Sequence, residues 1–287
     1  MRLLLAALPL VALAACTGDG GTPSGAGPSA VPSHDHGSAR VSLAVGDGTE
    51  RYDVGYTLSD VVLPAEVGEP GEVSFRIDSF RGTAQKEFLA EQTKRMHVYV
   101  VRDDLAVFRH VHPTMDAGGT WRGTLTLPEP GDYRLVAEFV ARDEGGNGDH
   151  VLLGDTVEVA GAWEPEPAPE PSGRGGDWGV DAEVLTPLRA GTPQQLTIRL
   201  TRPDGAAPSL GQYLGTSAHL TGFHTRTGGA VHMHPLGAPA PDARGDAPGV
   251  DLEFHAEMPE AGSYVLFLQV RVDDFLHTLA VPVEVAA

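Results

Sequence analysis

Histidines carry the most chemically suggestive pattern in this chain, in two stretches at residues 97–113 and 219–235. The two 17-residue stretches are identical at only four positions, His97/His219, His110/His232, His112/His234 and Pro113/Pro235. Neutral imidazole nitrogens are good ligands for zinc, copper and nickel. A duplicated pattern that keeps its imidazoles while the residues between them differ therefore predicts transition-metal binding.

A hairpin is expected to bring the first three histidines together. Asp103-Asp104 lies between alternating and β-branched residues, which predicts a two-residue turn. That turn places His97 opposite His110, with Cβ atoms about 4.5–5.5 Å apart. His112 follows on the same face, about 6.8 Å further along the strand. The three imidazoles should converge at one end of one sheet face, and the equal spacing of His219 and His232 predicts the same register in the second copy.

The repeat extends beyond these stretches. Residues 259–264 match residues 128–133, and residues 283–286 match residues 157–160, so the chain repeats after about 120 residues and contains two domains of one fold. A fourth histidine pair opens the last strand of each domain, His150 seven residues before Val157 and His277 six before Val283. Eight of the twelve histidines are thus predicted metal ligands: His97, His110, His112, His150, His219, His232, His234 and His277.

The elements that position these histidines are expected to be strands. Short alternating runs separated by Gly and Pro predict an all-β fold of two tandem immunoglobulin-like or cupredoxin-like β-sandwiches, at residues 40–160 and 178–287. Pro130 to Tyr133 resembles the tyrosine corner of immunoglobulin-like domains. Residues 161–177 are rich in Pro and Glu and predict an extended linker. The first domain's expected strands are 40–46, 51–63, 72–79, 95–102, 105–112, 120–127, 132–141 and 150–159.

The N-terminal residues predict export. Residues 1–16 read as a signal peptide, with an apolar run too short to span a bilayer. The run ends in Leu-Ala-Ala-Cys, which resembles the lipobox of bacterial lipoproteins. The resemblance implies cleavage before Cys16, its lipidation, and anchoring at the extracytoplasmic face of the cell membrane. The alternative is a free cysteine in an ordinary signal. Residues 17–39 are rich in Gly, Ser and Pro and predict a flexible tether, which carries His34 and His36.

Composition narrows the possible partners. A formal net charge of −19 opposes binding to nucleic acid. Cys16 is the single cysteine, which excludes a disulfide, a thiolate metal site and the usual His₂Cys blue-copper centre from the exported part. No H-E-x-x-H motif or nucleophile elbow is present, so we expect a protein that is not an enzyme.

The lipobox, the sandwich pattern and the His-x-His-Pro motifs together resemble periplasmic copper-handling proteins of the CopC-like and YtkA-like kinds. The resemblance implies a copper ion, with a zinc ion as the alternative, held for capture, buffering or delivery to a metal-transport partner. Met96, Met115 and Met233 are candidate soft ligands for copper(I), although Met233 should point to the opposite face from its neighbours. Two other functions remain open, an envelope interaction module with structural histidines and a metal-dependent enzyme.

Overall fold

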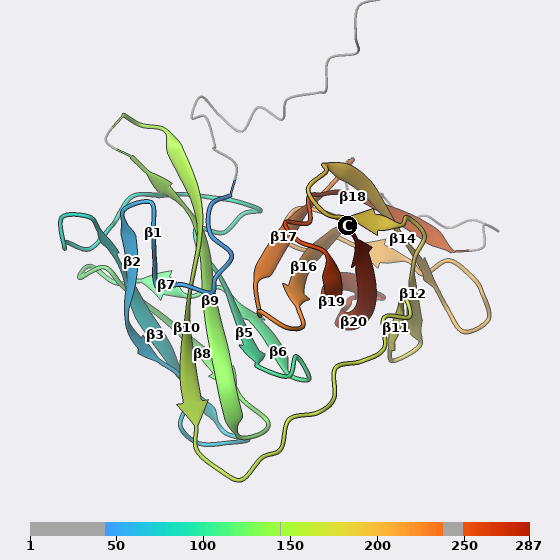
Figure 1. Ribbon diagram of the computed structural model, residues 1–287, viewed down its shortest axis with the longest axis horizontal. Coiled ribbons are helices and arrows are strands. Elements are labelled where there is room, and N and C mark those ends of the chain that lie inside the picture. The colour runs from blue at the N-terminus through green and yellow to red at the C-terminus, as the bar shows by residue number, and fades with distance from the viewer. Residues whose placement is uncertain (1–43, 144, 238–248) are drawn as a thin grey trace, which may run out of the picture. The chain divides into compact units, whose positions relative to one another are not determined.

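The computed structural model describes residues 44–143, 145–237 and 249–287 (Figure 1). The predicted signal peptide, Cys16, the predicted tether and residues 40–43 of the first expected strand lie outside the described residues. The described residues belong to one compact unit. None of the described residues belongs to a helix that is long and apolar enough to cross a membrane.

The first domain is a sandwich of two antiparallel sheets. Its core is formed by the side chains that alternate inward along each strand, such as Val98 and Val100, while Tyr99 and Val101 point away from it. The first sheet, in spatial order, contains β1 (Tyr52–Asp53), β2 (Tyr56–Val62), β3 (Pro70–Ser79), β8 (Thr120–Thr126) and β7 (Thr114–Met115). The second contains β10 (Gly148–Val159), β9 (Gly131–Arg142), β5 (His97–Arg102) and β6 (Phe108–Val111), with β4 (Phe88–Leu89) paired to β9.

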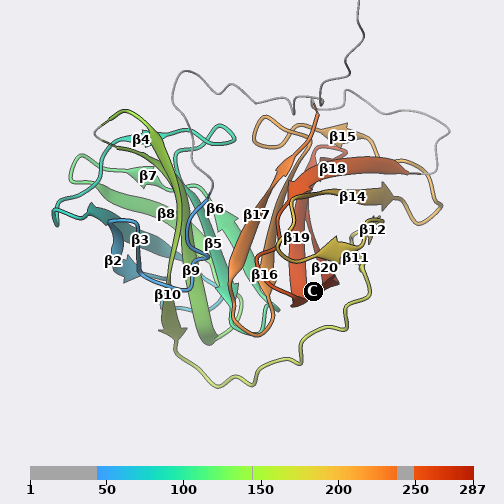
Figure 2. The ribbon, with the colours of Figure 1, turned by 45° about the horizontal axis from the view of Figure 1, so that its top comes forward.

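The second domain repeats this arrangement, but its strands form one continuous sheet (Figure 2). The two halves of the sheet are joined where β17 pairs with β18, at His234 opposite His255. In spatial order the strands are β11 (Arg174–Asp177), β12 (Val180–Val184), β14 (Gln194–Thr201), β18 (Val250–Ala256), β17 (Ala230–Pro235), β16 (Ala218–His224), β19 (Gly262–Val272), β20 (Phe275–Ala286) and β13 (Leu188–Arg189), with β15 (Leu210–Gly211) on β19.

The predicted architecture of two tandem all-β, immunoglobulin-like sandwiches is confirmed. The tyrosine corner occurs in both, because the Tyr133 hydroxyl donates to the Glu129 carbonyl at 2.7 Å and the Tyr264 hydroxyl to the Glu260 carbonyl at 3.1 Å. Two boundaries differ from expectation. Strand β11 lies inside the predicted linker 161–177 and pairs with β12. Within 40–46, the described residues 44–46 contain one isolated bridge from Val45 to Val151 rather than a strand.

The hairpin that carries the first histidines has a longer turn than the sequence predicts. Tyr99 pairs with His110 and Val98 with Val111, and the Arg102 N–H donates to the Val107 carbonyl, so the loop contains residues 103–106. The prediction that His97 lies opposite His110 is therefore wrong by two residues. A shift of two keeps every side chain on its face of the sheet. The second copy has the predicted equivalent register, with Thr221 opposite His232.

The two sandwiches share an apolar cluster outside their own cores. The aromatic rings of Phe108 and Phe267 stack within it, with centroids 4.2 Å apart and planes at 7°. Its members come from both domains: Tyr99, Val101, Leu105, Phe108, Val136 and Leu152 from the first, and Phe223, Ala230, Val265 and Phe267 from the second. Because these side chains stand on the outer faces of β5, β6, β9, β10, β16, β17 and β19, the same faces that carry the histidines meet one another.

Candidate metal centre

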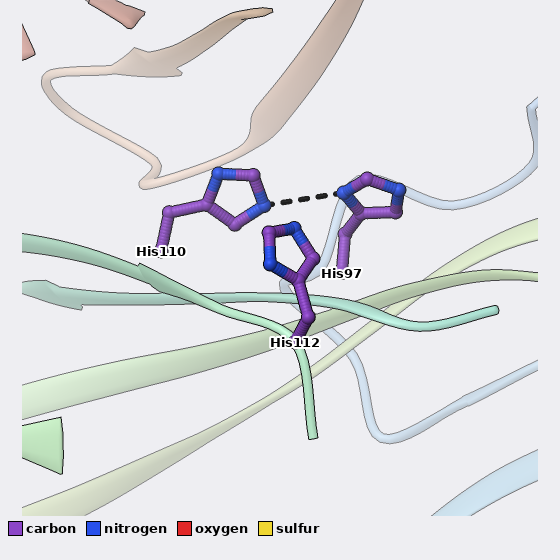
Figure 3. Close-up of side chains that lie close together, drawn as sticks. All are labelled: His97, His110 and His112. Atoms are coloured by element: carbon purple, nitrogen blue, oxygen red, sulfur yellow. Dashed lines mark hydrogen bonds between the residues drawn. The ribbon is translucent and has the colours of Figure 1, made fainter. Parts of the chain in front are cut away.

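Three imidazoles of the first domain converge at one point (Figure 3). His97 comes from β5, His110 from β6 and His112 from just after β6, and one ring nitrogen of each lies within 4.8 Å of the other two. The closest pair is His97 Nδ1 and His110 Nε2, 3.2 Å apart. Two nitrogens bound to one tetrahedral zinc ion lie about 3.3 Å apart, since each metal–nitrogen bond is about 2.0–2.1 Å long. This pair therefore already has the separation of two ligands on one ion.

Hydrogen bonds to two of the three rings fix which of their nitrogens carry protons. His97 Nε2 lies 3.0 Å from the Glu91 carbonyl oxygen, and His110 Nδ1 lies 2.6 Å from Gln269 Oε1. Both oxygens only accept, so these two nitrogens donate. In neutral rings His97 Nδ1 and His110 Nε2 then carry lone pairs that face each other, while His112 Nε2 is buried without a hydrogen-bond partner. Such carbonyl partners commonly orient histidines that bind a metal through the other nitrogen.

Burial keeps these rings neutral. Burial lowers the pKa of His97. Burial, together with the nearby rings of His112 and His97, holds the pKa of His110 well below its usual value. Burial and the neighbouring His97 and Lys94 lower the pKa of His112 to about 3. A metal ligand must be deprotonated to bind. The three nitrogens are therefore available to a metal ion throughout the neutral pH range.

The second histidine set, His219, His232 and His234, contacts the first set, His97, His110 and His112, but has different hydrogen-bond partners. His232 donates from Nδ1 to the Glu138 carboxylate at 2.8 Å, and its Nε2 accepts from the Gln92 amide at 3.1 Å. His219 Nε2 lies 3.3 Å from the Tyr99 hydroxyl oxygen, whereas its Nδ1 is buried without a partner. His234 lies 3.6 Å from a carboxylate oxygen of Glu91. Both nitrogens of His232 are thus used by protein groups.

Glu138 is the residue that sequence reasoning missed. Its side chain is 1% exposed and accepts hydrogen bonds from the Tyr99 hydroxyl at 2.5 Å, from His150 Nε2 at 2.7 Å and from His232. Burial opposes its ionisation, but His232 and His150 outweigh burial and hold the pKa of Glu138 well below its usual value. The same contact raises the pKa of His150 in spite of burial. One acid within the apolar run 135–140 was the available signal, together with Gln269 at the matching place in β19.

Ring contacts join seven of the eight predicted histidines and leave out His277. The side chain of His277 lies on the face of Val270, which belongs to the core of the second sandwich, and its Nδ1 is 3.2 Å from Asp177. Its placement in the cluster is a wrong prediction. His150 pairs with Val140, which is two residues from Glu138 on β9, so His150 and Glu138 share a face. His277 pairs with Val270, which is one residue from Gln269 on β19, so His277 and Gln269 lie on opposite faces.

The methionines do not supply soft ligands from this face. Met96 and Met233 are fully buried members of the two sandwich cores, and Met115 packs against the first core. The expectation that Met233 points away from its neighbours is confirmed, while the suggestion that Met96 could reach the cluster is not supported by its position. The candidate donor set therefore consists of imidazoles, a carboxylate and the Tyr99 hydroxyl.

Comparisons with known proteins give a family. A family model described as "Domain of unknown function (DUF8832)" matches residues 49–150 and 176–287, which agrees with the predicted repeat. No curated protein matches the chain.

Three solved structures show how distant the structural neighbours are. The BSP domain of a biofilm-associated protein is 13% identical with a TM-score of 0.21, and the match covers 77% of this chain and 28% of that one. A tetra-tandem repeat of a large adhesion protein is 12% identical with a TM-score of 0.24, covering 81% and 49%. Invasin, a bacterial integrin-binding protein, is 14% identical with a TM-score of 0.22, covering 81% and 39%. The chain spans less than half of each, and likenesses this weak carry no argument about function.

Proposed function

Because the chain belongs to DUF8832, a family described as a domain of unknown function, we propose its function from its own residues: it binds a transition-metal ion at His97, His110 and His112. The binding is non-catalytic and serves capture, buffering or delivery of the ion. The leucine-alanine-alanine-cysteine sequence at residues 13–16 supports a place at the extracytoplasmic face of the cell membrane, with Cys16 as the lipid anchor.

One observation carries this proposal. His97 Nδ1 and His110 Nε2 are 3.2 Å apart, and the other nitrogen of each ring is bonded to a carbonyl oxygen. Two lone pairs that face each other repel unless a cation lies between them. A proton could take that place only on a ring whose pKa is lowered by burial. A metal ion satisfies both nitrogens, and His112 Nε2 as well.

The donor chemistry favours copper before zinc. Copper(II) binds nitrogen ligands more tightly than the other common divalent ions do. Zinc(II) also accepts three imidazoles and a fourth ligand, and it remains the alternative. A metal-transport protein that receives the ion is the partner we propose. Nucleic acid is not a proposed partner, because a net charge of −19 repels phosphate.

The test uses the mature protein purified without a polyhistidine tag. Wild type should bind copper(II) against a competing chelator, and His110→Ala should bind at least about 100-fold more weakly, since second-shell changes alone commonly cost 10–100-fold. His277→Ala is the matched control, because His277 lies in the other domain away from the cluster. Wild type that binds copper(II) and zinc(II) no more tightly than His110→Ala would show the proposal to be wrong.

A second candidate function is an envelope interaction module whose histidines are structural. The bonding of His232 and His150 favours it, because these rings stabilise a buried carboxylate without any metal. It predicts that His110→Ala lowers the melting temperature of metal-free protein and changes no metal affinity. The same titration, repeated with a thermal melt of each variant, separates the two functions.

A further inference from the structure

The two histidine sets occupy equivalent positions in the two repeats. The Glu91–Lys94 bridge corresponds to the Tyr213–Thr216 bridge, and both loops have a positive φ at the next residue, Gln92 and Leu214. Glu138 lies opposite His97 on β9, as Gln269 lies opposite His219 on β19. A residue of one repeat can therefore be compared directly with its counterpart in the other.

The hydrogen bonds between the repeats cross. His110 of the first repeat is bonded to Gln269 of the second at 2.6 Å, and His232 of the second is bonded to Glu138 of the first at 2.8 Å. Each repeat thus orients the middle histidine of the other. If the repeats were identical, this arrangement would produce two equivalent metal sites.

Three pairs of counterparts break the equivalence. Gln92 of the first repeat caps His232 Nε2, whereas its counterpart Leu214 has no polar group in its side chain. Tyr99 contacts Glu138, His219 and His232 through its hydroxyl, whereas the buried hydroxyl of its counterpart Thr221 is bonded to no histidine or carboxylate.

The third pair is Glu138 and Gln269, in which the first repeat has a carboxylate and the second has a neutral amide. Through these differences both nitrogens of His232 are hydrogen-bonded, whereas His97 and His110 each have only one nitrogen bonded to an acceptor oxygen. His97, His110 and His112 therefore keep lone pairs, while His232 keeps none.

His219 is the exception in the second repeat. It is fully buried, its Nε2 is next to the Tyr99 hydroxyl, and its Nδ1 has no partner. Its ring centroid lies 4.4 Å from that of His110 and 5.5 Å from that of His97, with the His97 and His219 planes only 19° apart. A buried nitrogen without a hydrogen-bond partner destabilises the folded protein, so His219 Nδ1 needs a partner.

We propose that the two histidine sets form one composite site for a single ion, with His97, His110 and His112 as three ligands and His219 Nδ1, which must move toward their mutually close nitrogens on binding, as the fourth. His232 and His150 are not ligands in this site. They hold the Glu138 carboxylate beside it as the counter-charge of the ion. The inference rests on the proposed metal binding and adds its stoichiometry and its fourth ligand.

Native mass spectrometry of the full mature chain with copper(II), and separately with zinc(II), gives the stoichiometry. One ion per chain is expected. X-ray absorption of the loaded wild type should report four imidazole nitrogens, a readout that needs no variant. Two ions per chain, or three imidazoles only, would overturn the composite site while leaving metal binding intact. No ion at all would overturn the proposed function itself.

Variants then assign the fourth ligand. His219→Ala should weaken copper(II) binding at least about 100-fold, because ligand loss exceeds the 10–100-fold cost of second-shell changes. His277→Ala is the matched control, since His277 lies in the same domain as His219 but is bonded to Asp177 outside the cluster, and this variant should bind copper(II) nearly as tightly as wild type. If His219→Ala is too unstable to purify, the imidazole count of wild type decides alone. Equal losses in both variants would refute the assignment.

Discussion

The variant Glu138→Gln tests most directly how much the buried carboxylate and its hydrogen bonds stabilise the protein. The carboxylate accepts three hydrogen bonds, from the Tyr99 hydroxyl, His150 Nε2 and His232 Nδ1. A glutamine keeps one oxygen acceptor and turns an N–H toward the remaining donors, so up to two of these bonds are lost. At about 1.5 kcal/mol for each hydrogen bond to a charged group, the variant should lose about 3 kcal/mol of unfolding free energy. For a domain pair of this size that lowers the melting temperature by about 6–12 °C.

The assay is urea unfolding of metal-free protein at several pH values, with the exposed Glu253→Gln as the control. The folded pKa of Glu138 is depressed, so its contribution is present above the unfolded value of 4.5 and is lost as the pH falls through the folded value. The folded pKa of His150 is raised, so its contribution is present below 6.5 and is lost as the pH rises through the folded value. The difference between wild type and Glu138→Gln should therefore be largest between pH 4.5 and 6.5. A difference under about 0.5 kcal/mol throughout that window would refute the reasoning.

Three further predictions follow from the same features. Copper(II) affinity should stay constant as the pH falls through 6.5 and decline only at lower pH, because the pKa values of His97, His110 and His112 are lowered; a decline centred at 6.5 in a chelator competition titration would contradict this. Cys16→Ser should release the protein from the membrane fraction or leave the precursor uncleaved, and continued lipid labelling of that variant would rule out the anchor. Limited proteolysis should cut first within residues 161–172, which form no strand and are mostly exposed, and mass spectrometry of the fragments shows whether the first cut lies instead in 97–112.

The sequence predicts the fold well because its signals are local. Alternation along β5 places Tyr99 on one face and Val98 on the other, and this survives an error of two residues in the turn. The turn itself was mispredicted because Asp103-Asp104 has the composition of a tight turn, while Leu105 at a positive φ extends the loop to four residues.

The site was predictable only in part. Residue spacing sets the sheet face on which a side chain lies, but it does not identify the hydrogen-bond partners that other strands supply. Counting residues to Val157 and Val283 gave seven for His150 and six for His277, and that odd difference already separated their faces. Glu138 could not be assigned in the same way. Its role depends on Tyr99, His150 and His232, which reach it from three other strands. No spacing within β9 reveals partners that tertiary packing supplies.

The apolar cluster shared by the sandwiches has a consequence for the peptide that connects them. Each half alone would expose Phe108 or the pair Phe223 and Phe267 to water, and would leave Glu138 without His232. The connecting residues 161–172 take part in no sheet, so they act mainly by raising the effective concentration of one half near the other. A chain nicked there should stay associated and elute as one species. The two halves made as separate polypeptides should reconstitute the native protein on mixing, with an affinity that depends on Phe267.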